Sequence, residues 1–292
     1  MNDASIQINQ PDFRGESSKD IQTKPVGAVR KKRPYRLNRL ISIVVFFIVW
    51  EIFSRLNEQF SWFNPIFLPA PTEILQTAWD LAKSGVLLSS ILSSTIRLLA
   101  GFVIGTAAAV LLGMIMVLYS KVEDGIAPIL NLVGPIPALA LLPIFIIWFG
   151  IGEVPKILLI AWTIFIPVHV YTLSGLKSVN QTLIRSAMSL GASDRKIFLK
   201  VILPSAIPSI LVGAEVSLGL GFSSLIVSEM MGAKSGLGYI IVDARNYFKL
   251  SNMFVAVVTI GLEFSLFSMG LKFIERRVVA WKKAGFQNAI EK

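Results

Sequence analysis

The 292-residue chain contains no cysteine and a single histidine, His169. Without thiols, the chain has no disulfides, thiolate nucleophiles or cysteine-ligated metal sites. A lone histidine in an apolar segment is typical of a hydrogen-bonded packing residue, and a histidine-rich metal site is not expected. Charged residues are also scarce, at 16% of the chain, whereas 54% are hydrophobic. Because this composition is more apolar than that of an average soluble domain, we expect much of the surface to face lipid.

Six long, weakly charged segments contain the excess of hydrophobic residues. Each is close to the ~20 residues that a helix needs to cross a ~30 Å hydrocarbon layer. A helix satisfies its backbone hydrogen bonds internally, as lipid requires. We therefore predict an all-α membrane protein with six transmembrane helices in a lipid bilayer. The segments are 40–56, 98–118, 126–149, 157–176, 207–227 and 253–271.

The net charge of +10 is distributed unevenly along the chain. Lys and Arg concentrate in 1–39, 177–204 and 272–292, which lie on one side of the membrane if all six segments span it. Positive residues favour the cytoplasmic side, so both termini are predicted to be cytoplasmic and no nucleic-acid partner is expected. We divide the chain into a basic disordered tail at 1–39, a transmembrane domain at 40–274 and a cytoplasmic tail at 275–292. The basic cluster 30–33 suits a lipid head-group anchor or a nuclear-type signal.

Two of the predicted spans have unusual compositions. The second has small residues at a four-residue spacing, which lets membrane helices approach closely. The third contains four prolines, which interrupt helices, so we expect 134–143 to lie against other helices or a pathway. The small residues are Gly101, Gly105, Ala109 and Gly113, and the prolines are Pro128, Pro135, Pro137 and Pro143. On the outer side, Thr72 is a candidate N-cap for an amphipathic helix at 73–82, lying along the interface or against the bundle.

The cytoplasmic connection 178–205 is predicted to form two short helices with a bend between them. Its first helix should cover 179–190, and Gly191 suits a left-handed position after its end. Ser193 is a candidate N-cap for a second helix at 194–201, and Pro204 should stop that helix at the membrane surface. Such a slim, bent surface suits insertion into a groove of another protein, and the alternative is a solvated loop without a special role.

This connection resembles the signature loop of ABC-transporter permeases of the bacterial importer type. That pattern has Glu-Ala-Ala, three residues, Gly, nine residues and then Ile-x-Leu-Pro. The glycine corresponds to Gly191 and the ending to 201–204, whereas the triplet falls on 185–187 and keeps only Ala187. Segments 67–71, 142–152 and 235–239 are also similar to the taurine, aliphatic sulfonate, nitrate and bicarbonate branch of this family. The residues that match the coupling loop are Arg185, Ser186, Ala187, Leu190, Gly191, Ala192, Ser193, Lys196, Leu203 and Pro204.

The resemblance, which covers about 40–283, implies a type I importer permease of six helices in the bacterial inner membrane. It implies a pair of permease subunits, two separate ATP-binding-cassette ATPase subunits that engage the coupling loops, and an extracytoplasmic solute-binding protein. Independently, the chain has no Gly-x-x-x-x-Gly-Lys-Ser/Thr run, which would cradle phosphates. We therefore expect a non-enzymatic subunit without a cofactor, with ATP and Mg²⁺ bound by the partner ATPase. Taurine or another alkanesulfonate is the expected solute, and nitrate, bicarbonate or another small solute is the alternative.

Several polar residues fall within or beside the predicted spans. Ionisable groups in a membrane usually face protein or water, so these residues either line a pathway or form internal pairs that fix helix packing. They are Arg97, Glu215, Ser223, Ser224, Glu229 and Glu263. An ion-coupled secondary transporter that uses Glu215 and Glu263 is an alternative function, although no inverted repeat is visible. An intramembrane enzyme is disfavoured, because the chain lacks paired histidines, a cysteine nucleophile and metal-ligand spacing.

Overall fold

A computed structural model describes residues 35–279, with side chains from residue 41 onward. The chain divides into two compact units, Met1–Ile48 and Val49–Lys292. In the first unit, the described residues all belong to the start of helix α1 (Tyr35–Phe60). Residues 1–34 of the predicted N-terminal tail therefore lie outside the described residues. Its last five residues, 35–39, belong to α1 and are helical. Residues 280–292 of the predicted C-terminal tail also lie outside the described residues. Its first residues, 275–278, are the end of the last helix, α11 (Leu250–Val278).

The second unit is built from helices, and strands are absent from the described part of the chain. Short 3-10 helices occur at η1 (Pro65–Phe67) and η2 (Ala138–Leu141), and a π-helix occurs at η3 (Phe198–Ile202). The α-helices that follow α1 are α2 (Pro71–Lys83), α3 (Val86–Leu118), α4 (Ser120–Val133), α5 (Leu142–Phe149), α6 (Glu153–Lys177), α7 (Gln181–Ser189), α8 (Asp194–Ile197), α9 (Leu203–Met230), α10 (Leu237–Asn246) and α11 (Leu250–Val278).

Four helical segments among the described residues are long and apolar enough to cross a membrane. They are α3, α6, the continuous stretch Asp194–Met230, and α11. A fifth candidate is the pair Ser120–Val133 and Ala138–Phe149, whose halves are bent by 94°. The bend falls in the proline-rich stretch where an interruption was predicted, because Pro lacks a backbone donor. The all-α membrane fold is confirmed, whereas the count of six spans stays a prediction.

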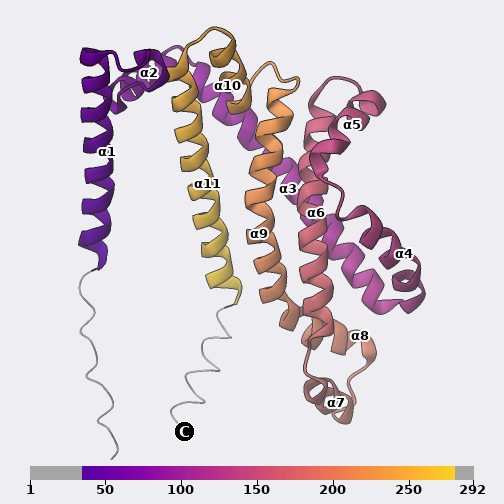
Figure 1. Cartoon of the computed structure of the whole chain (residues 1–292). Helices are drawn as coiled ribbons and strands as arrows, with labels where there is room; N and C mark the ends of the chain where they lie inside the picture. The colour runs from indigo at the N-terminus through magenta and orange to yellow at the C-terminus, as the bar shows by residue number, and fades with distance from the viewer. Residues whose placement is uncertain (1–34, 280–292) are drawn as a thin grey trace, which may run out of the picture. The chain divides into compact units, whose positions relative to one another are not determined.

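Helix α6 packs along both α3 and α9, and these three helices form the core of the second unit (Figure 1). Their shared cluster includes the buried side chains of Leu98, Ile164 and Leu225. The small face of α3 lies against α6: a Cβ on Gly101 would be 2.5 Å from the Ile160 side chain. The close approach predicted from this spacing is therefore present.

Helix α2, predicted to lie on the outer side, starts earlier than the sequence suggested. Its N-cap is Ala70, and the backbone N–H of Ala70 donates to the Glu73 carboxylate at 3.2 Å. The prediction of Thr72 as N-cap is wrong, because its N–H and hydroxyl both donate to Glu51, at 3.1 and 2.9 Å. Ile74 is buried against the rest of the second unit, so one side of α2 packs against protein, whereas Leu75 and Trp79 are exposed. Its position along the interface stays a prediction.

Candidate functional sites: a bent connection and a buried charge cluster

The connection between α6 and α9 forms a bend that we call the elbow, residues 178–205. Asn180 caps α7 by accepting a hydrogen bond from the Thr182 N–H at 2.8 Å. After α7 the chain turns at Gly191, whose φ of +75° is left-handed. The N–H of Ala192 donates to the Ala187 carbonyl at 3.1 Å, which satisfies a carbonyl at the end of the helix. The predicted first helix and glycine turn are confirmed.

The second half of the elbow differs from the prediction in two respects. Ser193 occupies the N-cap position of α8, but its side chain makes no capping hydrogen bond. Pro204 does not stop the helix, because α8, η3 and α9 run on as one helical stretch from Asp194 to Met230. Pro204 is the second residue after the π-helix and lies in the first turn of α9, where a residue without an N–H is tolerated because the first N–H groups of a helix have no partner within it.

The elbow combines a buried base with an exposed apolar tip. At its base, Ile197 and Phe198 are buried, and Phe198 packs with Leu176 and Ala206. At its tip, Leu190 is 88% exposed beside Gly191. Other exposed side chains are Leu183, Arg185, Ser186, Met188, Ser193 and Lys196, whereas Ala187, Ala192, Leu203 and Pro204 are half-buried. The elbow is thus a projection with a buried base and an exposed surface of apolar and basic side chains.

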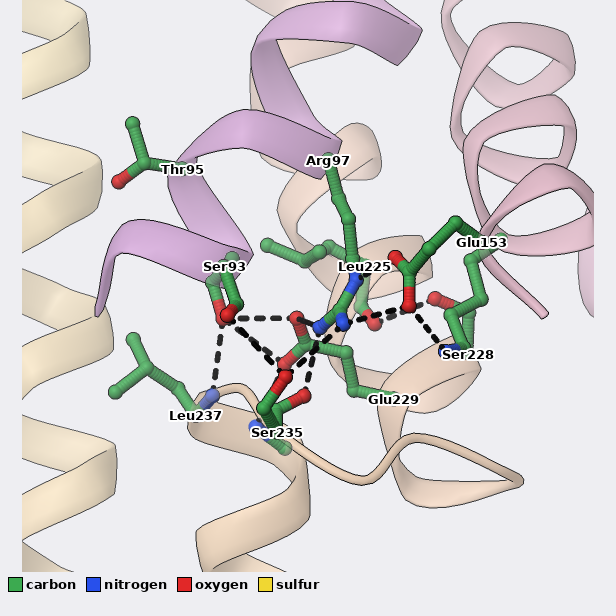
Figure 2. Close-up of polar contacts among 12 residues, drawn as sticks. Ser93, Thr95, Arg97, Glu153, Leu225, Ser228, Glu229, Ser235 and Leu237 are labelled. Atoms are coloured by element: carbon green, nitrogen blue, oxygen red, sulfur yellow. Dashed lines mark hydrogen bonds and ion pairs between the residues drawn. The ribbon is translucent and has the colours of Figure 1, made fainter. Parts of the chain in front are cut away.

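A second group of polar residues, the charge cluster, lies toward the opposite ends of α3, α6 and α9. Its centre is Arg97 of α3, which lies between Glu153, the first residue of α6, and Glu229, near the end of α9 (Figure 2). The side chains of Arg97 and Glu229 are 5% and 0% exposed, whereas Glu153 is 56% exposed. One side of the cluster is therefore closed by protein and the other is open.

Every nitrogen of the Arg97 guanidinium donates a hydrogen bond. Nε and Nη2 donate to the two carboxylate oxygens of Glu153, a bidentate arrangement in which the Nη2 bond is 2.9 Å. Nη1 donates to Glu229 and to the Ser235 carbonyl, both at 2.7 Å, and Nη2 reaches the Ser235 hydroxyl at 3.3 Å. Lys156 donates to Glu153 at 3.1 Å. The two cations thus share the exposed carboxylate.

The Glu229 carboxylate occupies a niche formed by the turn between α9 and α10. It accepts hydrogen bonds from the Ser94 hydroxyl at 2.8 and 3.0 Å and from the Gly238 N–H at 2.9 Å. A Cβ on Gly236 would lie 2.5 Å from the Glu229 carboxylate, and the φ of Gly236 is +122°. Glycine is therefore required at this position, which accounts for one residue of the segment 235–239 singled out in the sequence.

Three of the other polar residues predicted within the spans have hydrogen-bond or ion-pair partners outside the charge cluster. Glu263 accepts a hydrogen bond from the Thr95 hydroxyl at 2.6 Å, one of the internal pairs considered from sequence. Glu215 pairs with Lys272 at 3.0 Å, and both side chains are more than a third exposed. The Ser223 hydroxyl bonds to the Gly219 carbonyl of its own helix. Ser224 is buried.

Sequence reasoning found Arg97 and Glu229 but missed several of their partners. Ser94, Glu153 and Ser235 were not predicted, because these contacts join residues far apart in the sequence. Lys156, which pairs with Glu153, was also missed. One available signal was the position of Glu153 directly after the glycines of 150–152, at a helix start. No group of three or more His, Asp or Glu residues suited to a metal ion occurs within residues 41–279.

These observations define a multi-pass helical membrane protein, with the elbow at one end of its core helices and the charge cluster toward the other. Residues 101–283 match the model of a transport family, and the chain belongs to this family, the binding-protein-dependent transport system inner membrane components. It is thus a permease subunit of an ABC importer, as the resemblance in its elbow had indicated.

Similar proteins that are named as transport permeases agree with this assignment. The chain is 31% identical over 276 residues to the putative aliphatic sulfonates transport permease protein SsuC of Bacillus subtilis, covering 93% of this chain and 99% of the relative. It is 34% identical over 245 residues to the taurine transport system permease protein TauC of Escherichia coli, covering 82% and 88%. The crystal structure of an amino acid ABC transporter with histidines shares the fold, with a TM-score of 0.56 at 18% identity, covering 68% of this chain and 96% of that one.

Proposed function

We propose that this chain forms, with a second copy, the translocation pathway of an ATP-driven importer for a small sulfonate. Two separate ATPase subunits each receive one elbow, and an extracytoplasmic solute-binding protein delivers the solute. The relatives that carry aliphatic sulfonates and taurine in their names support the solute class. The chain itself catalyses no covalent step and binds no ATP or Mg²⁺, which belong to the ATPase subunits.

The observation that carries this proposal is the exposed apolar tip of the elbow. Leu190 is 88% exposed at the C-terminal end of α7, and the apolar side chains of Leu183 and Met188 on that helix are exposed as well. Removing such a side chain from water in a partner's groove contributes about 1.5–3 kcal/mol. The concentration of Lys and Arg in the segments on the same side predicts a cytoplasmic tip, in the compartment where ATP is available.

The structure of the elbow suits the transmission of force. Its buried base at Ile197 and Phe198 joins it to the continuous helical stretch that contains α9. A displacement of the tip by a closing ATPase pair would therefore move α9, together with α6 and α3, which pack against one another. We infer that this movement changes the side to which the pathway is open.

The test replaces the glycine of the turn by a bulky residue. Gly191→Leu places a side chain in a left-handed position beside the docking surface, so we expect loss of ATPase subunit co-purification and of ATP-dependent uptake. Gly85→Leu is the matched control, since its φ of +77° resembles the +75° of Gly191 and both positions have open space around a Cβ. Both changes carry a similar strain of about 1–2 kcal/mol.

A second variant separates docking from backbone strain. Leu190→Asp leaves the backbone unchanged and replaces the exposed apolar tip by a charge, so ATPase association should fall by at least about tenfold. Normal co-purification and uptake in both Gly191→Leu and Leu190→Asp would overturn the proposed role of the elbow.

A further inference from the structure

Two buried cations of the charge cluster converge on a carboxylate that is itself open to the outside of the fold. Arg97 and Lys156 have side chains that are 5% and 6% exposed, whereas Glu153 is 56% exposed. Glu229 balances the inner side of the guanidinium. One monovalent anionic group, the Glu153 carboxylate, thus balances the remaining positive charge from the accessible side.

The geometry around Glu153 is that of an oxyanion site. The Nε and Nη2 atoms of Arg97 form a fork that holds two oxygens of one group, an arrangement suited to carboxylate, sulfonate and other oxyanions. The Lys156 ammonium approaches the same group at 3.1 Å from α6. Any single anion with two or three oxygens would satisfy the same donors.

Lys156 provides a second, independent indication of a ligand. An ammonium has three donors, and the structure shows one acceptor for it, the Glu153 carboxylate. Lys156 also lines a small cavity of about 10 Å³, together with Gly152, Ser228 and Gly232. A space of this size holds about one water or one ligand oxygen. A buried ammonium with spare donors beside such a space is suited to a further oxygen.

We propose that Arg97 and Lys156 form a binding site for the transported oxyanion, in which the Glu153 carboxylate occupies the anion's place when the site is empty. An arriving monoanion displaces this carboxylate into solvent, one negative charge for another, so the buried cations are never left unpaired. The inference rests on the proposed function for the identity of the anion as the solute. It adds a position on the chain where the solute's charged group binds.

The experiment measures binding of methanesulfonate to the full-length permease in phosphatidylcholine nanodiscs. Glu153→Gln removes the built-in competitor and should tighten binding by at least about tenfold, whereas Lys156→Gln should weaken it by a similar factor. The matched controls are Glu58→Gln and Lys249→Gln, exposed residues predicted to lie on the same outer side. Both controls should bind as the unchanged chain does.

A second measurement does not depend on how the variants fold. The unchanged chain should bind methanesulfonate in preference to its neutral analogue methanesulfonamide, because the site recognises charge. Equal binding of the two compounds, or a Glu153→Gln affinity indistinguishable from that of Glu58→Gln, would overturn the proposal. So would a Glu153→Gln chain that shows no binding in the millimolar range.

The same chemistry could also be supplied by the head group of an anionic lipid. Repeating the assay in phosphatidylglycerol nanodiscs distinguishes the two sources. We expect an unchanged affinity, and a tenfold weaker affinity in that lipid would assign the site to head groups and contradict our proposal. None of these measurements needs the ATPase, so failed docking at the elbow and a failed anion site give different results.

Discussion

Glu229 shows how one buried charge determines the residues around it. Its carboxylate accepts hydrogen bonds from Ser94 and Arg97 of α3 and from the Gly238 backbone N–H of α10. A buried charge is tolerated only when it is paired and hydrogen-bonded, so each of these donors is constrained. The glycine at 236 belongs to the same arrangement, because its missing side chain leaves the space that the carboxylate fills.

We therefore predict that Gly236→Ala destabilises the permease by about 2–4 kcal/mol, through a clash with Glu229 and a backbone conformation that alanine rarely adopts. The melting temperature of the purified permease in detergent measures this effect. Gly261→Ala is the matched control, because it lies within α11 and a Cβ there meets no atom within 4 Å. A Gly236→Ala chain as stable as the Gly261→Ala chain would show that the niche is not a constraint.

The contacts of α11 bear on the alternative function, an ion-coupled secondary transporter that uses Glu215 and Glu263. Its Glu263 is paired with a hydroxyl of α3, and Glu215 of α9 pairs with Lys272 of α11. Both interactions connect helices, and neither carboxylate belongs to the charge cluster. In an ATP-driven importer these two acids contribute to packing and carry no coupling ion.

Glu263→Gln keeps an acceptor for Thr95, and Glu215→Gln loses the ion pair with Lys272 between α9 and α11. We expect each variant to retain uptake within about twofold, measured with ATP in proteoliposomes that contain the complete transporter and its binding protein. A collapsed proton gradient should leave that uptake unchanged. Loss of uptake in both variants, or on collapse of the gradient, would favour the secondary transporter.

Local patterns predicted the helical elements and turns of this fold well. The left-handed turn at Gly191, the small face that includes Gly101 and the break near Pro137 all follow from properties of single residues or of one helix. The continuous helix through Pro204 was mispredicted, because proline was taken as a stop signal and the π-helix before it has no clear sequence signature.

The charge cluster was only half predictable for a different reason. The free-energy cost of placing a charged side chain in a membrane indicates that Arg97 and Glu229 need partners. It does not say which partners, since Arg97 is separated from Glu153 by 56 positions and from Glu229 by 132. Only the packing of α3, α6 and α9 brings the three together, and that packing is a property of the folded chain.

In the whole molecule, the two ends of the core formed by α3, α6 and α9 have different proposed roles. One end carries the elbow, which we propose receives force from the ATPase. Toward the other lies the charge cluster, which we propose receives the anion. This division requires the elbow to be cytoplasmic, as the distribution of Lys and Arg predicts.

The absence of cysteine makes this orientation directly measurable, because one introduced thiol is the only one in the chain. Ala192→Cys should react with a membrane-impermeant maleimide in inside-out vesicles stripped of ATPase, and bound ATPase should slow the reaction. No reaction is expected in intact cells. Labelling of Cys at position 192 from outside intact cells would place the elbow on the wrong side of the membrane and contradict the account.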